Sequence, residues 1–160
     1  MIGKLSFPEI DHLLESQSVG HIGCYDGDEV YVVPISYAYA NDCIYCHTNE
    51  GKKIDIMRQN PKVCFQVDKV DDLSNWNSVI AWGEFKEISD QEERNNVLQI
   101  LLHSHMTATS SIQDHLGPAW PFSSKNQDDL TKITGILFKI CLRRKTGKFE
   151  KTSSTSLPCI

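Results

Sequence analysis

Short segments in the first half of the chain alternate hydrophobic and polar residues, which is the pattern of β-strands. The segments 19–25 and 30–40 are rich in Val, Ile and Tyr, and Asp26-Gly27-Asp28 lies between them. Because the glycine can adopt the positive φ of a tight turn, these segments are expected to pair as an antiparallel hairpin. A turn at Asn41-Asp42 then leads to a third expected strand at 43–48.

Three other segments carry the signals of helices. Ser6-Phe7-Pro8-Glu9 has the form of a capping box and predicts a helix that ends at about Gln17. Apolar residues at helical spacing predict a second helix over 49–60, which stops before Pro61. A second capping box, Ser89-Asp90-Gln91-Glu92, opens a third helix with an apolar stripe.

Further strands are expected over 63–69, 78–88 and 132–142, with Trp76 in a polar loop before the second of them. The segment 107–129 has no periodicity, and we expect a long loop there that serves a function or contacts a partner. Six short antiparallel strands with inserted helices predict a mainly β fold. Because an open sheet of this size would leave its edges unprotected, we expect a closed or nearly closed barrel.

Composition and charge narrow the classes of protein that fit this fold. The chain has 160 residues, 40% of them hydrophobic, which suits one domain, expected over 1–150 with a flexible tail at 151–160. The 16 Lys and Arg residues against 21 Asp and Glu residues give a net charge of -5, which argues against a general binder of nucleic acid or of anionic membranes. A small anionic ligand at one local site is still compatible with this charge. The chain shows no signal peptide and no apolar stretch long enough to span a bilayer, so we expect a cytoplasmic protein.

The six cysteines are expected to be thiols, because the chain is long enough to form an ordinary core. Cys43-Ile44-Tyr45-Cys46-His47 has the spacing of a covalent haem site. In a strand, however, residues three apart face opposite sides of the sheet, so Cys43 and Cys46 are expected to bind neither haem nor zinc. We therefore expect no metal site.

Two features indicate where a ligand could bind. Lys52 and Lys53 lie at the start of the second helix, where positive charge interacts unfavourably with the helix dipole. A bound anion would make the interaction at this end of the helix favourable. Free backbone amides, the Thr48 hydroxyl and the two ammonium groups would together form a phosphate site, unless both lysines only face solvent. Pro34 interrupts the hydrogen bonding of its strand, so that strand either faces a flat ligand or forms a barrel edge.

Five stretches, taken in order, resemble one known family of flavoproteins. They are Val19-Gly20-His21-Ile22-Gly23, Val32-Val33-Pro34-Ile35-Ser36-Tyr37, Ile44-Tyr45-Cys46-His47-Thr48 with Gly51-Lys52-Lys53, Asn60-Pro61-Lys62-Val63-Cys64-Phe65-Gln66-Val67-Asp68, and Ser78-Val79-Ile80-Ala81-Trp82-Gly83. The series is similar to the pyridoxamine 5'-phosphate oxidase-like family of FMN-binding split barrels, and within it to the nitroimidazole resistance proteins. The resemblance implies a six-stranded antiparallel split β-barrel.

The resemblance also implies FMN at the interface of a homodimer and assigns residues to it. The flavin ring would lie along Val33, Pro34, Ile35 and Ser36, and the wall would continue through Tyr45, Cys46, His47 and Thr48. Lys52 and Lys53 would hold the phosphate, and Asn77 or Ser78 would reach the flavin from the partner side. The C-terminal segment lacks a counterpart of the tryptophan and arginine that grip pyridoxal phosphate in the oxidases, which argues against that activity.

The resulting hypothesis is an FMN-dependent reductase of a small molecule such as a nitroaromatic. His47 is the expected proton donor, because the ordinary pKa of histidine lies near neutrality. Two alternatives remain: a protein that binds flavin without turnover, and a split barrel that binds or degrades haem. An absorption spectrum would distinguish the three.

Overall fold

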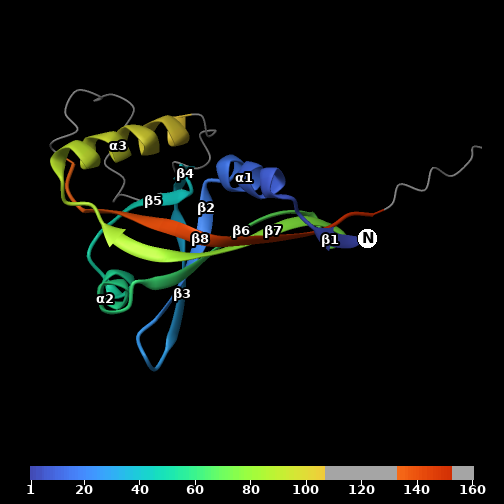
Figure 1. Cartoon of the computed structure of the whole chain (residues 1–160), viewed down its shortest axis with the longest axis horizontal. Helices are drawn as coiled ribbons and strands as arrows, with labels where there is room; N and C mark the ends of the chain where they lie inside the picture. The colour runs from blue at the N-terminus through green and yellow to red at the C-terminus, as the bar shows by residue number, and fades with distance from the viewer. Residues whose placement is uncertain (107–132, 153–160) are drawn as a thin grey trace, which may run out of the picture.

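The computed structural model describes residues 1–106 and 133–152, without the side chains of residues 105 and 106. The elements are β1 (Ile2–Lys4), α1 (Phe7–Ser16), β2 (Val19–Tyr25), β3 (Val30–Ser36), β4 (Ala38–Ala40), β5 (Cys43–Thr48), α2 (Lys52–Gln59), β6 (Lys62–Asp72), β7 (Asn75–Glu87), α3 (Gln91–Met106) and β8 (Ile136–Glu150) (Figure 1). The expected loop at 107–129 and most of the expected tail lie outside the described residues.

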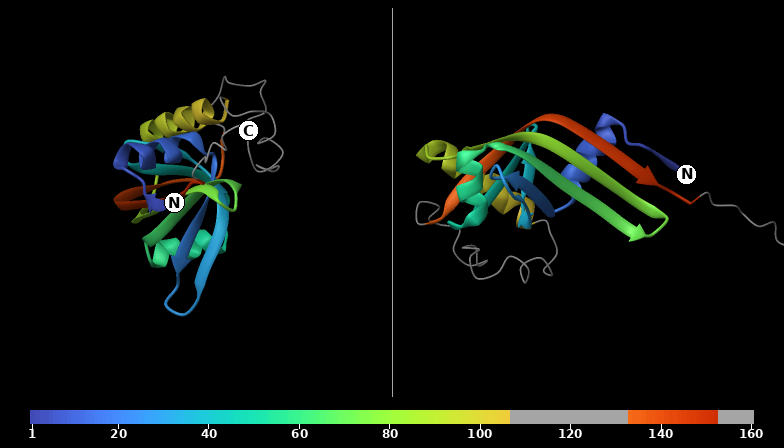
Figure 2. Two further views of the ribbon diagram at one scale, coloured as in Figure 1. Left: turned by 90° about the vertical axis from the view of Figure 1, so that its right-hand side faces the viewer. Right: turned by 90° about the horizontal axis from the view of Figure 1, so that it is seen from below.

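The strands form one antiparallel sheet in the order β3-β2-β6-β7-β8-β5-β4, and β1 pairs with β8 beside this path. Helices α1 and α2 contribute side chains to one core cluster, and α3 contributes to a second cluster on the opposite face of the sheet. Strands β6, β7 and β8 extend beyond the rest of the sheet as a long arm, which β1 joins (Figure 2). The expected mainly β, antiparallel fold with inserted helices is therefore confirmed, but with eight strands in place of six.

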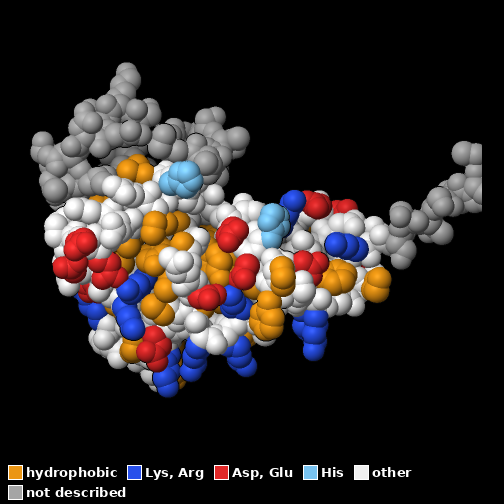
Figure 3. Space-filling view, turned by 45° about the horizontal axis from the view of Figure 1, so that its top comes forward, with side chains coloured by type: hydrophobic (Ala, Val, Ile, Leu, Met, Phe, Trp, Pro, Cys, Tyr) orange, Lys and Arg blue, Asp and Glu red, His pale blue; other side chains and the backbone are white. Residues whose placement is uncertain are grey.

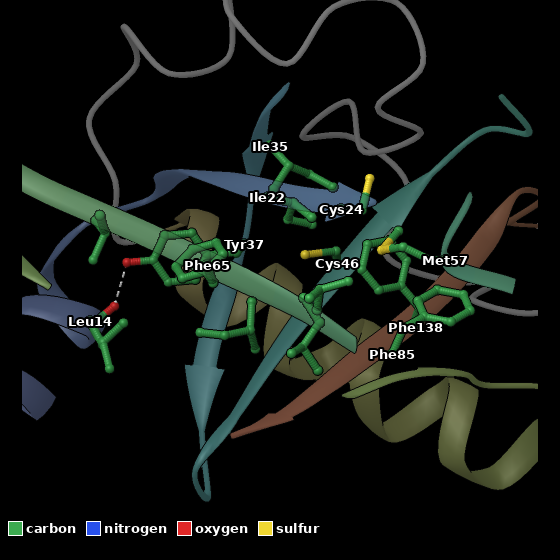
Figure 4. Close-up of a cluster of buried hydrophobic side chains, with 14 of the residues drawn as sticks. Leu14, Ile22, Cys24, Ile35, Tyr37, Cys46, Met57, Phe65, Phe85 and Phe138 are labelled. Atoms are coloured by element: carbon green, nitrogen blue, oxygen red, sulfur yellow. Dashed lines mark hydrogen bonds between the residues drawn. The ribbon is translucent and has the colours of Figure 1, made fainter. Parts of the chain in front are cut away.

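The extra strands have local causes. The expected strand 30–40 is divided at Tyr37, which leaves the β3 ladder and enters the core. Its backbone N–H donates to Ser18 O at 3.0 Å, and its buried hydroxyl donates to Leu14 O at 2.7 Å (Figure 4). Strand β1 has only three residues, which is too short for any alternation to be recognised in the sequence.

The arm strands are longer than their hydrophobic pattern predicts. Trp76 lies in β7 rather than in a loop, and its ring N–H donates to Glu150 at the end of β8. Strand β8 continues eight residues past Leu142, the expected end, through a segment with charged residues. Polar residues are tolerated there because the strands of the arm are paired through backbone bonds while much of their surface faces water.

The two capping boxes have different outcomes. In α1 the box is present as expected: the Ser6 backbone N–H donates to the Glu9 carboxylate at 2.8 Å. In α3 the cap is one residue later than expected, because Asp90, not Ser89, accepts the Glu93 backbone N–H, at 3.0 Å. Aspartate at this position also has the favourable sign for the helix dipole.

Two clusters of buried side chains make up the core. The first fills the space enclosed by the sheet and α1 and α2, with Tyr37, Phe65, Met57 and Phe138 among its largest members (Figure 4). The second lies between the sheet and α3 and includes Val97, Leu98 and Leu101 from the expected stripe of that helix, together with Ala38, Tyr45, Ile88 and Leu137. The sheet therefore has side chains packed on both faces near β5 and β8.

A cluster of charged side chains links helix α1 to strand β8. The Lys145 ammonium of β8 donates to Asp11 of α1 at 2.7 Å and to Asp42 of the β4–β5 turn at 2.6 Å. The Tyr39 hydroxyl accepts from the same ammonium at 3.0 Å, and its one proton can go to Asp11, at 2.8 Å, or to Asp42, at 3.0 Å. Asn41 and Asp42 both have positive φ, as a two-residue hairpin turn requires, so the expected turn is confirmed.

Among the helices that the structure describes, none is long and apolar enough to cross a membrane. On the face shown in Figure 3, hydrophobic side chains reach the surface in the middle, with acidic side chains beside them and basic ones along one edge.

Candidate cofactor site

The outward face of β3 is an exposed apolar surface. Along this strand Tyr31 and Ile35 point toward the core, whereas Val32 is 60% exposed and Pro34 is exposed as well. Strand β3 is also the last strand in the order of the sheet, which explains how a proline without an N–H is tolerated. Of the four residues expected beside a flat ligand, Pro34 and Ser36 therefore lie on the outward face. Ile35 lies in the core, and half-buried Val33 is on the same side as Ile35 by strand alternation.

A row of polar side chains crosses the same face next to Pro34. His21 of β2 pairs with Pro34 on one side and with Gln66 of β6 on the other. The Gln66 side-chain oxygen lies 3.2 Å from His21 Nδ1, and its amide donates to Asp68 at 3.1 Å and to Ser78 at 3.4 Å. The row therefore connects β3, through β2 and β6, to β7.

His21 and Gln66 were not among the residues singled out as ligand contacts from the sequence. Ser78, which was, is joined to them by the row, whereas its neighbour Asn77 lies on the other face of β7 by strand alternation, the face of buried Val79. Only cross-strand register brings His21 and Gln66 together, and 45 residues separate them in the chain.

The start of α2 offers backbone donors. Gly51 is the N-cap and has no side chain to occupy the first-turn amides, and within the described part of the chain no side chain caps this helix. Its carbonyl accepts the N–H groups of Ile54 and Asp55, both at 3.1 Å. The earlier N–H groups point out of the helix end, where the dipole favours an anion.

The two lysines of this turn have different surroundings. The Lys52 ammonium lies 3.8 Å from the Glu29 carboxylate and 4.8 Å from the centre of the Tyr31 ring, so it leans toward the β2–β3 hairpin. Lys53 is half-buried. Burial raises the pKa of the Cys46 thiol and the charge of Lys53 opposes this change, whereas both lysines oppose it for Cys24. Of the two, Lys53 is the better placed to hold an anion at the helix start.

An ion-pair network fixes α2 and the loop before it. The Arg58 guanidinium binds the Glu50 carboxylate through two hydrogen bonds of 2.9 Å and the Glu87 carboxylate through bonds of 2.9 and 3.0 Å. Arg58 lowers the pKa of Glu87 in return. Because Glu50 precedes the helix and Glu87 ends β7, this network holds the start of α2 in place beside the sheet.

His47 is held under the segment before β8. Its Nε2 lies 2.7 Å from the Thr134 carbonyl oxygen. Gly135, with φ of 99°, leaves room for the ring, because a Cβ at this position would lie 2.7 Å from the same nitrogen. Burial lowers the pKa of His47, the Thr134 carbonyl opposes this change, and the charge of Arg94 adds to it. The ring is therefore neutral near pH 7 and is fixed in orientation by Thr134.

The remaining expected residues alternate along β5. Tyr45 is 9% exposed and packs under α3, whereas Cys46 is fully buried in the other cluster (Figure 4). A ligand could therefore contact these two residues only through their backbone, while Thr48 is half-exposed at the strand end. Cys43 also packs on the α3 side, so Cys43 and Cys46 face opposite ways, as expected. No group of three or more metal-binding side chains occurs among the residues that the structure describes.

The chain is similar in sequence and in structure to several known proteins. The chain is 33% identical over 84 residues to an uncharacterized protein of Rhizobium meliloti, a match that spans 52% of this chain and 56% of that protein. Among solved structures, a FAD-binding protein of Mesorhizobium loti has a TM-score of 0.70 at 28% identity, covering 94% of this chain and 99% of its own. A candidate 5-nitroimidazole antibiotic resistance protein of Bacteroides thetaiotaomicron has a TM-score of 0.71 at 21% identity, covering 93% and 87%.

The antiparallel sheet with its inserted helices is the split-barrel fold, shared with the FAD-binding protein of Mesorhizobium loti. The model of the pyridoxamine 5'-phosphate oxidase family matches residues 7–117, and the chain belongs to that family. The family resemblance read from the sequence is thereby confirmed.

Proposed function

We propose that this chain binds FMN and uses it to reduce a small molecule such as a nitroaromatic. The observation that carries the proposal is the uncapped start of α2, with Lys53 in its first turn, Thr48 at the end of the preceding strand, and Lys52 against the β2–β3 hairpin, where β3 has an apolar outward face. The start of α2 suits a phosphate and the apolar face of β3 suits a flat ring system. The flavin-binding relatives support the same assignment.

The residues fit this cofactor in the following way. The amides of the α2 start, Lys53 and Thr48 would hold the phosphate, and Lys52 would add charge from the side of the hairpin. The ring would lie along Pro34 and Ser36 on β3. Such a ring supplies the transfer of electrons to the substrate.

The protein's own groups would position the ring and control protons. Neutral His47, fixed by the Thr134 carbonyl, is a poor acid at neutral pH because burial lowers its pKa. Its expected role as proton donor therefore requires either a bound ligand that raises that pKa or a pH low enough to protonate the ring. The row of His21, Gln66 and Ser78 offers polar contacts on the face beside Pro34.

We also propose that the chain forms a homodimer, with the flavin between the subunits. Exposed Val30, Val32 and Ile80 lie on the outward side of β3 and β7, where a monomer would leave them in water. Ser78 of one subunit would then reach the flavin held at the α2 start of the other.

The test of the phosphate site compares Lys53→Ala with Lys52→Ala. A charge-assisted hydrogen bond contributes about 1.5 to 3 kcal/mol. Loss of the Lys53 contact should therefore weaken FMN binding by about ten- to a hundredfold. Lys52→Ala should have a smaller effect, because this ammonium leans toward Glu29 and Tyr31. Fluorescence titration with FMN gives the dissociation constants.

Riboflavin is the matched control ligand, because it has the ring and no phosphate, and its affinity should not change in Lys53→Ala. Equal weakening of FMN and riboflavin, or no effect on FMN, would contradict the assignment. The absorption spectrum separates the functions: a flavin spectrum bleached by a nicotinamide donor supports the reductase. A flavin that stays oxidised supports binding without turnover, and a Soret band supports a haem protein.

A further inference from the structure

Two thiols meet across neighbouring strands on the α3 side of the sheet. Cys43 of β5 and Cys141 of β8 are register partners, and their sulfur atoms lie 3.4 Å apart. The other three described cysteines have no such partner: Cys24 and Cys46 are buried in the first core cluster, and Cys64 lies on β6. The pair is also outside the candidate cofactor site.

The backbone geometry suits a covalent bond between the two sulfurs. The Leu142 N–H donates to Asp42 O at 3.0 Å, which makes the adjacent pair of Cys43 and Cys141 a non-hydrogen-bonded pair. In such pairs the Cα atoms are about 4.5 Å apart and the side chains are closest. Disulfides span Cα distances of about 4.4 to 6.8 Å, so small side-chain rotations could bring the sulfurs to the bond length of about 2.05 Å.

The surroundings allow a small oxidant to reach the pair. Both cysteines are half-exposed rather than buried. Burial and the neighbouring Cys141 raise the pKa of Cys43, while the hydrogen bond to Tyr45 and the charge of Lys139 oppose this change. Because the Cys43 thiol is then largely protonated at neutral pH, its reaction with an oxidant should be slow and should need a high concentration of that oxidant.

We propose that Cys43 and Cys141 form a reversible disulfide that links β5 to β8 when the protein meets a peroxide. One sulfur attacks the peroxide, so that an S–O bond forms, the O–O bond breaks and, for hydrogen peroxide, hydroxide leaves as water after protonation. The second sulfur then attacks the first: the S–S bond forms, the S–O bond breaks and a second water leaves. The two thiols lose two electrons and two protons in total, and a dithiol reductant reverses the reaction.

Hydrogen peroxide treatment of the purified full chain tests this proposal. In the wild type, titration of the denatured protein should show two fewer thiols, and the intact mass should fall by two hydrogen atoms; dithiothreitol should restore both. Cys43→Ser and Cys141→Ser should each lose no thiols to a disulfide. Cys64→Ser is the matched control, because it removes a half-exposed strand thiol without a partner, and it should still lose two.

Three results would overturn the proposal. They are a loss of two thiols in Cys43→Ser, oxygen added to the wild type without loss of hydrogen, and chains linked to each other on a non-reducing gel. Cys43→Ala and Cys141→Ala repeat the measurement with an apolar replacement, and circular dichroism verifies that each variant is folded. The outcome does not depend on flavin binding, so it tests this pair separately from the proposed cofactor site.

Discussion

At Gly83 the backbones of β7 and β8 approach each other closely. The pairing of these strands shifts register between Trp82 and Gly83, and a Cβ at Gly83 would lie 2.3 Å from the Cys141 carbonyl oxygen. The obstacle is backbone, so it cannot rotate away as a flexible side chain could. Because Gly83 has no side chain, β7 and β8 can shift register here and still remain paired as they continue into the arm.

We expect Gly83→Ala to lower the free energy of unfolding by about 1 to 3 kcal/mol, because the added methyl group forces strand β8 away. Gly51→Ala is the control: nothing lies within 4 Å of a Cβ there, and its φ of 168° is ordinary extended backbone. Urea unfolding of both variants measures the difference. If Gly83→Ala and Gly51→Ala were equally stable, the strands would accommodate the added methyl group without a loss of free energy of unfolding.

The pKa of His47 leads to a prediction about pH. Burial lowers this pKa in the folded protein below the ordinary value of about 6.5 that applies in the unfolded chain. As pH falls below 6.5, the unfolded chain therefore takes up the proton first, and the free energy of unfolding decreases until the pH passes the folded pKa. Above pH 6.5 neutral His47 makes its full contribution to the free energy of unfolding.

His47→Gln should make this part of the pH dependence smaller, because glutamine does not titrate. The difference between the wild-type and His47→Gln stability curves, measured by urea unfolding from pH 7.5 to about pH 5, isolates the histidine from the carboxylates that also titrate. A difference that stays constant over that range would contradict a lowered pKa.

At the residue scale, the sequence predicts those site residues that follow from local order and not those that follow from pairing. Thr48 and Lys53 were predicted because a strand end and a helix start are visible in the pattern. His21 and Gln66 meet through strand register, which no local pattern specifies. The different surroundings of Lys52 and Lys53 likewise depend on the hairpin that packs beside them.

Among the elements, α3 shows how a cap can be displaced by one residue. Ser89 and Asp90 are both good N-cap residues, and the expected capping box placed the cap at Ser89. In the structure Asp90 accepts the Glu93 N–H, and its own carbonyl accepts the Arg94 N–H. Arg94 also donates to the Ile88 carbonyl, which ties the start of the helix to the end of β7.

Asp90→Ala should lower the free energy of unfolding by about 1 kcal/mol, within the usual range of about 0.5 to 2 kcal/mol for loss of an N-cap. Ser89→Ala should change it much less, because Ser89 does not cap the helix. Thermal or urea unfolding of the two variants decides between the two capping positions. A larger effect in Ser89→Ala would favour the capping box read from the sequence.

At the element scale, strand centres are predictable and strand ends are not. The alternation of β2 and the first part of β6 matches the expected segments, because one face of each packs on the core. Strand β5 also matches its expected segment, although side chains pack on both of its faces. The continuation of β6, β7 and β8 into the arm has little burial to produce a pattern. Hydrogen bonding between neighbouring strands, which leaves no trace in one strand's sequence, sets their length there.

For the whole molecule, the exposed apolar residues on the outward side of β3 and β7 need a partner surface or a ligand. Val32 is 60% exposed and Ile80 is 38% exposed. On the same side Trp82 is half-buried and covered by the Arg144 guanidinium, 4.0 Å above its ring. Aromatic and arginine side chains are enriched in protein interfaces, which agrees with the proposed homodimer.

Val32→Glu should dissociate the proposed dimer, because it places a charge in an apolar contact, and should weaken FMN binding with it. Phe7→Glu is the control: Phe7 is also exposed, at 70%, but lies at the start of α1. Sedimentation equilibrium with and without FMN measures both variants. A wild type that stays monomeric at micromolar concentration with flavin bound would contradict the dimer.

The position of β8 in the sheet has a consequence for synthesis on the ribosome. This strand lies between β7 and β5, and among the strands that the structure describes it is the last in the chain. Until residues 136–150 have left the ribosome, β3-β2-β6-β7 and β5-β4 are two separate pieces of sheet, and β1 has nothing to pair with. A nascent chain halted before residue 136 should therefore remain open to proteases along the edges that β8 later covers, and the sheet should close only once β8 is free to pair.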